Sequence, residues 1–135
     1  GLGNGGTSTE NPDELLLSQL RENGFEINQT ATGLTMHRNT VTARFKGICF
    51  DLLVKHQVDS EKAAGEISKG ASNRSTVLQM INEYHENLRN TARESQSLDE
   101  AIQTALKRNK NVPAHYHSAI EKLVRIYRKD MDYEG

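Results

Sequence analysis

The sequence predicts an all-α protein, in which a head of three helices, the third of them long, precedes a small helical bundle. Apolar residues recur at helical spacing, the alternation typical of strands is missing, and segment ends carry residues that cap or stop helices. We therefore divide the chain into a flexible leader (1–10), the head (11–56) and a helical extension (57–135) that serves dimerisation or interaction.

The head begins after a leader rich in Gly, Ser, Thr and Asn, which has too little apolar material to fold. Asn11 is the expected cap of a first helix from Pro12 to Glu22, which Asn23-Gly24 ends. A second, short helix is expected to begin at Asn28 as N-cap and to stop around 33–35. The third helix runs from about His37 to Lys55 or His56.

The extension carries four further helix signals. Asp59 caps a short helix that Lys69-Gly70 ends, and Ser72 or Asn73 starts a longer one that reaches about Arg93. Ser97 and Glu100 form a capping box for a helix that stops at Asn109 or Asn111. Pro113 suits the first turn of the last helix. The apolar stripe of that helix is Ile120, Val124, Tyr127 and Met131.

Composition excludes several classes of protein. No apolar run approaches the ~20 residues that span a bilayer, so no membrane partner is expected. Seventeen basic and eighteen acidic residues give a net charge of -1, which excludes a wholly basic nucleic-acid binder. A single cysteine, Cys49, forms neither an internal disulfide nor a four-ligand zinc site, and favours a reducing, cytoplasmic compartment. Tryptophan is absent and aromatic residues are few, which argues against stacking of single-stranded nucleic acid.

The stretch from Glu26 to Lys46 has the form of two helices joined by a tight turn, the arrangement that places a helix in the DNA major groove. With Val41 at the centre of the buried face, Phe45, Ile48 and Leu52 fall beside it. The side chains expected to point outward or to flank that stripe are Asn39, Thr42, Ala43, Lys46, Arg38 and Arg44, with His37 at the helix start. Asn pairs with adenine edges, and Lys or Arg reaches guanine or phosphate. The local charge is consistent with binding to DNA, because residues 15–56 carry a net charge of +2.

A family resemblance rests on Thr30-Ala31-x-x-Leu34-x-Met36-His37-Arg38-Asn39-Thr40-Val41-x-x-Arg44-Phe45-Lys46 and on the preceding Leu15-Leu16-x-x-Gln19-Leu20-x-x-Asn23-Gly24. About 45 of the 135 residues are involved, from roughly Asp13 to His56. They resemble the Fis-type helix-turn-helix domain that ends the sigma-54-dependent activators of the NtrC class, and the HRNTV core is similar to that of PucR-type regulators. Thr35 stands where the pattern usually has Gly, and Ala43 where it often has a basic residue.

The resemblance implies roles for individual residues. Asn28 would cap the first helix of the motif, and Ala31 would be its small packing residue. The DNA-facing side and phosphate rim would be lined by Arg38, Asn39, Thr40, Thr42, Arg44 and Lys46. The function implied is sequence-specific binding of double-stranded DNA by a bacterial transcription regulator, with residues 37–47 in the major groove. In the sigma-54 class, an ATP-hydrolysing domain would lie upstream, and the full-length protein would act on the RNA polymerase sigma-54 holoenzyme.

The apolar residues Phe50, Leu53 and Val54 lie nearly opposite Val41 on the third helix. A helix that is apolar all round is buried on both sides, so either the C-terminal helices or a second subunit should cover them. Binders of this type commonly work as homodimers on half-sites ~34 Å apart.

A different function is a helical protein-protein interaction module that uses the helix-turn-helix only as scaffold. We find no catalytic constellation and expect neither an enzyme nor a cofactor. We expect no metal either, because the side chains of His115 and His117 point in different directions on a helix.

Overall fold

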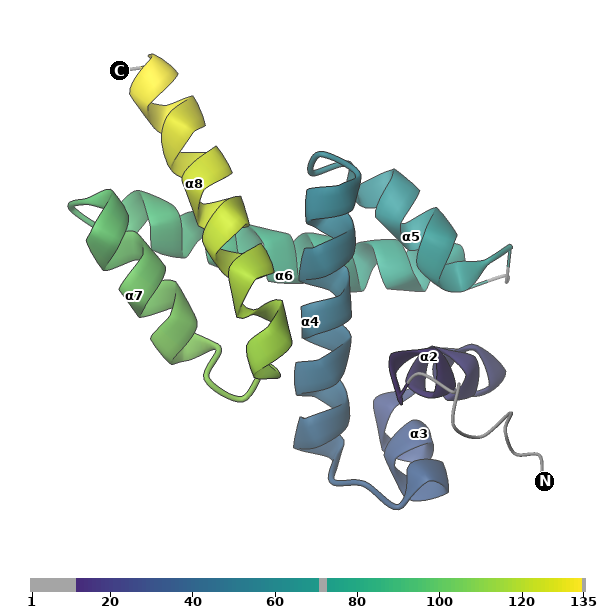
Figure 1. Cartoon of the computed structure of the whole chain (residues 1–135). Helices are drawn as coiled ribbons and strands as arrows, with labels where there is room; N and C mark the ends of the chain where they lie inside the picture. The colour runs from purple at the N-terminus through teal and green to yellow at the C-terminus, as the bar shows by residue number, and fades with distance from the viewer. Residues whose placement is uncertain (1–11, 71–72, 135) are drawn as a thin grey trace.

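The computed structural model describes residues 12–70 and 73–134, and within these ranges every regular element is helical, as predicted (Figure 1). The elements are α2 (Pro12–Glu22), α3 (Ile27–Leu34), α4 (Arg38–Lys55), α5 (Ser60–Ser68), α6 (Arg74–Glu94), α7 (Leu98–Arg108), the short 3-10 helix η1 (Ala114–Tyr116) and α8 (His117–Glu134). The expected leader and the expected cap Asn11 lie outside the described residues. No described helix is both long enough and apolar enough to cross a bilayer.

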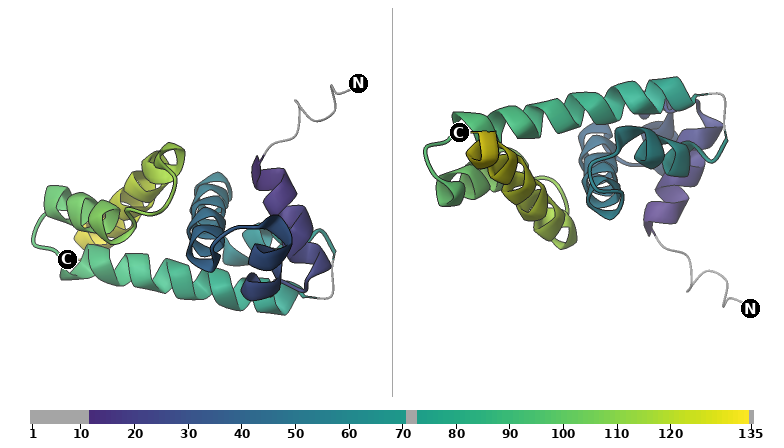
Figure 2. Two further views of the ribbon diagram at one scale, coloured as in Figure 1. Left: turned by 90° about the horizontal axis from the view of Figure 1, so that it is seen from below. Right: turned by 90° about the horizontal axis from the view of Figure 1, so that it is seen from above.

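Helix α4 stands at the centre of the arrangement. It packs against α2 and α3 on one side, against α6, α8 and η1 on the other, and against α5 at its C-terminal end (Figure 1). Helix α6 runs along one side of the molecule, from the end near α2 and α5 to the group formed by α7 and α8 (Figure 2). Four consecutive residues of α4, Gly47 to Phe50, are buried, so the middle of this helix is covered all round.

Most helix ends agree with the local signals in the sequence. The N–H of Lys62 donates to Oδ1 of Asp59 over 3.1 Å at the start of α5, and the N–H of Glu100 donates to Oγ of Ser97 over 3.1 Å at the start of α7. These bonds satisfy N–H groups that the first turn of a helix leaves without a backbone partner. Helix α2 has the expected bounds.

Two expected helix starts are wrong. Glu26, not Asn28, caps α3: its Oε1 accepts from the N–H of Asn28 over 3.2 Å, so the helix begins earlier, at Ile27. Pro113 does not open the last α-helix either, because its backbone is extended (ψ 142°) and the short η1 intervenes before α8.

Tyr116 of η1 fastens the C-terminal half of the chain to α4. A Cβ placed on Gly47 would lie 2.7 Å from Cγ and 2.9 Å from Cε2 of the Tyr116 ring, so the ring rests directly on the backbone of α4. The Tyr116 hydroxyl donates a hydrogen bond to the carboxylate of Asp13 in α2. Only a residue without a side chain permits this approach, and the contact fixes η1 and the loop before it against α4.

Candidate nucleic-acid interface

The first turn of α4 presents consecutive polar side chains to solvent. His37, Arg38, Asn39 and Thr40 are all exposed, whereas Val41, the next residue, is fully buried. His37 also caps the helix, because its Nδ1 accepts from the N–H of Asn39 over 3.1 Å. This cap was not foreseen from the sequence, since the usual N-cap residues are Ser, Thr, Asn and Asp.

A three-residue link sets the angle between α3 and α4. Thr35 adopts a left-handed backbone (φ 56°, ψ 46°), and the N–H of Met36 returns to the carbonyl of Ala31 over 2.9 Å. A left-handed residue after a helix commonly closes its last turn, and Gly is favoured there. The chain thus enters α4 with α3 beside its N-terminal end (Figure 1).

Aromatic packing holds this end of α4 in place. The ring of Phe45 lies 6.2 Å from that of Phe25, which precedes α3, and 6.2 Å from that of Tyr84 in α6. Thr30 is buried with its hydroxyl satisfied, since Oγ1 donates to the carbonyl of Glu26 over 2.9 Å and accepts from Nδ2 of Asn23 over 3.2 Å. The exposed first turn therefore stands on a rigid base.

The second and third turns of α4 are less open than expected. Thr42 and Lys46 are half-buried, and Ala43, expected to face outward, is buried. The segment between α7 and η1 approaches this side of α4, and one hollow is lined by both. Its residues are Asn39, Thr42, Ala43 and Lys46 from α4, with Arg108, Asn109, Asn111 and Val112. Helical periodicity gives the direction of a side chain but not what a distant segment places in front of it.

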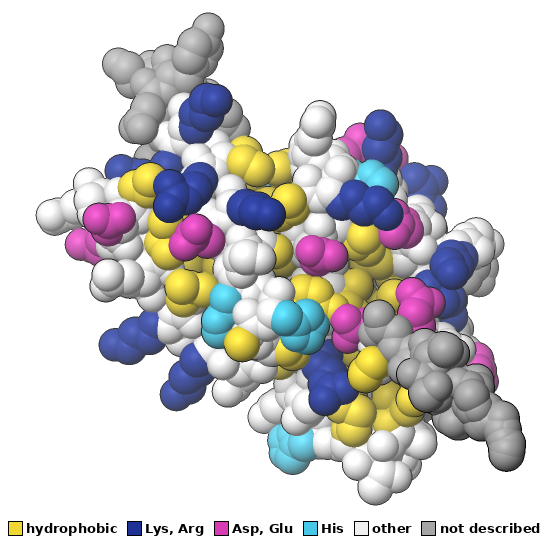
Figure 3. Space-filling view, in the orientation of Figure 1, with side chains coloured by type: hydrophobic (Ala, Val, Ile, Leu, Met, Phe, Trp, Pro, Cys, Tyr) yellow, Lys and Arg dark blue, Asp and Glu magenta, His cyan; other side chains and the backbone are white. Residues whose placement is uncertain are grey.

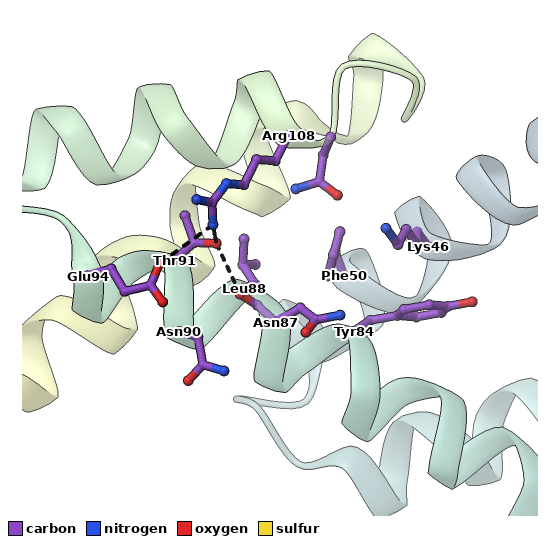
Figure 4. Close-up of a pocket in the computed structure, with 10 residues that line it drawn as sticks. Lys46, Phe50, Tyr84, Asn87, Leu88, Asn90, Thr91, Glu94 and Arg108 are labelled. Carbon is purple, nitrogen blue, oxygen red and sulfur yellow. Dashed lines mark hydrogen bonds and ion pairs between the residues drawn. The ribbon is translucent and has the colours of Figure 1, made fainter.

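A larger polar groove continues from this hollow between α4, α6 and α7 (Figure 4). Both spaces are lined by Lys46, Arg108 and Asn109. The ammonium of Lys46 lies 5.5 Å from the centre of the Tyr84 ring, a cation–π distance. Nη1 of Arg108 donates to Oγ1 of Thr91 over 2.9 Å and lies 3.8 Å from Oε1 of Glu94. The hollow and the groove together are therefore lined by cationic side chains and side-chain amides.

The remaining predicted residues lie elsewhere on α4. Arg44 is half-buried and lines a recess with Pro12, Asp13, Pro113 and His115. Burial raises the pKa of the Asp13 carboxyl, against the opposing charges of His115 and Arg44. Phe50 and Leu53 are buried and Val54 is half-buried. Phe50 contributes to the floor of the polar groove, beside Tyr84 and Leu88.

The structure thus gathers His37, Arg38, Asn39 and Thr40 into one exposed turn, and it brings Thr42 and Lys46 up to a segment that the sequence did not implicate. That segment is Lys107-Arg108-Asn109-Lys110-Asn111, and its signal in the sequence is three cations among five residues. Such a run is usually a solvated surface, so its location beside α4 could only come from the fold.

Other candidate groups have structural roles. No group of three or more His, Cys, Asp or Glu side chains in the described ranges is arranged to hold a metal ion. Nε2 of His117 lies 2.9 Å from the carbonyl oxygen of Val112, and Nε2 of His115 lies 3.8 Å from Oδ2 of Asp13. Cys49 is fully buried, and burial raises the pKa of its thiol, as befits a core residue.

No protein-family model, curated protein or solved structure matches the chain.

Proposed function

We propose that the chain binds duplex DNA sequence-specifically, as the DNA-binding part of a bacterial transcription regulator. Helices α3 and α4 would act as a helix-turn-helix, and the first turn of α4 would enter the major groove. One observation carries the proposal: His37, Arg38, Asn39 and Thr40 are exposed together at the N-terminal end of a helix whose buried face begins at Val41.

The chemistry of this turn suits base edges and phosphates. The Asn39 amide has the donor and acceptor pair that matches an adenine edge, and the Arg38 guanidinium matches the two acceptors of guanine. The N-terminal end of α4 carries the positive end of the helix dipole, which favours a neighbouring phosphate. Glu26, which caps α3, is the nearest acidic residue before this turn in the sequence, and Asp51 is the nearest after it.

A second function, a protein-protein interaction module, is favoured by the covered middle of α4. Ala43 is buried and Lys46 lies over Tyr84, so the helix does not offer its whole length to a groove. The polar groove between α4, α6 and α7 would then receive a segment of a partner protein. The two functions differ in ligand, and one experiment separates them.

The experiment is selection of bound duplexes from random DNA, followed by affinity measurements on the selected duplex and on an unrelated one. Arg38→Ala and Asn39→Ala should each weaken the selected duplex by about 1–3 kcal/mol and remove the preference for it. Lys46→Ala should weaken both duplexes more evenly. Arg93→Ala and Asn82→Ala, at exposed positions of α6, are the matched controls and should leave both affinities unchanged.

The same selection would reveal a homodimer. Two heads that bind half-sites ~34 Å apart would select duplexes that contain an inverted repeat. If the chain binds no duplex at low salt, or if Arg38→Ala and Asn39→Ala leave binding intact, the DNA-binding proposal is wrong and the interaction module takes its place.

A further inference from the structure

Carboxylates are unevenly distributed along this chain. Two stretches, 27–50 and 101–120, contain no Asp or Glu at all, and each contains three Lys or Arg residues. The net charge of the whole chain is -1, so the remaining residues together carry -7, the difference between eleven basic and eighteen acidic side chains. The positive charge is thus concentrated in the two stretches, although the protein as a whole is slightly acidic.

The fold brings these two stretches together. Residues 27–50 form α3 and most of α4, and residues 101–120 form most of α7, η1 and the start of α8. Asn39, Thr42 and Lys46 line one hollow with Arg108, Asn109 and Asn111. The C-terminal end of α7 and the loop that follows it lie beside the N-terminal half of α4 (Figure 1).

Several contacts hold the segment 107–111 in this position. Nδ2 of Asn109 donates to the carbonyl of Ala105 over 2.8 Å, and Nη1 of Arg108 donates to Oγ1 of Thr91 in α6 over 2.9 Å. Downstream, the ring of Tyr116 rests on Gly47 of α4. The segment is therefore tied to the fold on both sides, and its cations are presented at a fixed place relative to the first turn of α4.

Two cations of the segment are free to bind a ligand. Lys107 and Lys110 are exposed, and neither forms an ion pair with any described residue, unlike Arg108, which Thr91 and Glu94 engage. Lys and Arg side chains stand out from the surface around the lower end of α7, without acidic side chains between them and the lower end of α4 on this face (Figure 3). An ammonium group on a long flexible stem binds phosphate as a point charge and needs no fixed geometry.

We propose that the segment Lys107–Asn111 is a second DNA contact, which binds phosphates of the duplex next to the groove that the first turn of α4 enters. This inference rests on the proposed function. Lys107 and Lys110 each neutralise one phosphate, and the exposed amide of Asn111 donates to a phosphate oxygen. The segment adds affinity for any duplex and no preference among sequences, because phosphates carry no sequence information directly.

The test compares two variants that each lose two exposed lysines. Lys107→Gln with Lys110→Gln removes the proposed contacts, and Lys62→Gln with Lys69→Gln removes the same charge from α5 and its C-cap, at the opposite end of α4. Arg108 stays in place because it supports the fold. Binding of the selected and of an unrelated duplex is measured over a range of salt concentrations, and thermal unfolding by circular dichroism verifies that both variants fold as the unaltered chain does.

For the 107/110 variant, the slope of log affinity against log salt should be shallower by about 1.8, because each lost phosphate contact contributes about 0.9. If the affinities extrapolated to 1 M salt are equal, this corresponds at ~0.1 M salt to a loss of affinity of about 60-fold for both duplexes, with the preference between them unchanged. The α5 variant should keep the slope of the unaltered chain.

Three outcomes would overturn the inference. An unchanged slope in the 107/110 variant refutes the second contact alone and leaves the proposed function standing. An equal loss of slope in both variants shows that only the overall charge matters. If the unaltered chain binds no duplex, the proposed function and this inference fail together.

Discussion

Replacement of Gly47 by Ala tests the contact that joins the two halves of the chain. In the interior of an exposed helix, Gly→Ala stabilises by about 1 kcal/mol. Here the added Cβ would lie 2.7 Å from Cγ and 2.9 Å from Cε2 of Tyr116, well inside ordinary contact distance. The atoms struck belong to the base and edge of a ring whose hydroxyl is bonded to Asp13, so the ring has little freedom to turn away.

The expected net effect is a loss of stability. Overpacking of a well-filled site costs about 1–3 kcal/mol, and several ring atoms are struck at once, so we expect the upper part of that range. After the gain in helix propensity is subtracted, Gly47→Ala should lower the free energy of unfolding by about 1–2 kcal/mol. Urea denaturation followed by far-UV circular dichroism measures this quantity.

Tyr116→Ala provides the control, because it removes the ring that the new methyl group would strike. In that background, Gly47→Ala should change sign and stabilise by about 1 kcal/mol, which gives a coupling of about 2–3 kcal/mol between the two positions. If Gly47→Ala stabilises the unaltered chain, or if its effect is the same with and without the Tyr116 ring, the ring does not rest on α4 as described.

Two further predictions concern stability. Thr35→Gly should raise the free energy of unfolding by about 1 kcal/mol, because Thr35 has a left-handed backbone that a β-branched residue adopts at a cost. The control Thr32→Gly, within α3, should lower the free energy of unfolding by about 0.5–1 kcal/mol. Equal effects of the two variants in urea denaturation would contradict this prediction. Burial lowers the pKa of His85, whose Nδ1 lies 2.6 Å from the Tyr127 hydroxyl, so the unfolded chain takes up the proton first as pH falls below about 6.5 and stability should decline there. His85→Gln should flatten that part of the pH profile, and an unchanged profile would count against the assignment.

The fold class and most helix ends could be predicted because their signals are local. Pro12 and the Asn23-Gly24 pair lie at the two ends of α2, and Asp59 and Ser97 cap the helices that follow them. Each of these residues acts on backbone groups within one turn of itself. The predicted start of α3 is wrong because the rank order of capping residues favours Asn28, whereas the carboxylate of Glu26 accepts from the N–H of Asn28 and caps the helix two residues earlier.

The candidate site was predictable only over one helical turn. Helical periodicity around Val41 predicts that Asn39 points to solvent and that Arg38 flanks the buried stripe, while Thr40 is implied only by the resemblance; all three are exposed. One turn further along, the same argument fails for Ala43, which is buried beside a hollow that residues of the distant segment 109–112 also line. A helical projection contains no information about long-range packing. The run of charged residues at 107–111 likewise does not indicate which part of the fold it lies beside.

The covered middle of α4 constrains how this helix would meet DNA. With Ala43 buried and Lys46 held over Tyr84, the predicted DNA-facing residues of α4 are fully exposed only in the first turn, and four helical residues rise ~6 Å along the axis. The major groove is ~8.5 Å deep, so such a turn would enter by its end rather than lie along the groove, and it would touch few base pairs. Sequence preference from one head would then be modest, and useful affinity requires a further source. The phosphate contacts proposed for Lys107 and Lys110 supply affinity without preference, whereas a second head on a neighbouring half-site supplies both. The 107/110 variant could show a shallower slope of log affinity against log salt and still select an inverted repeat. That result would show that the phosphate contacts and the second head contribute to affinity separately.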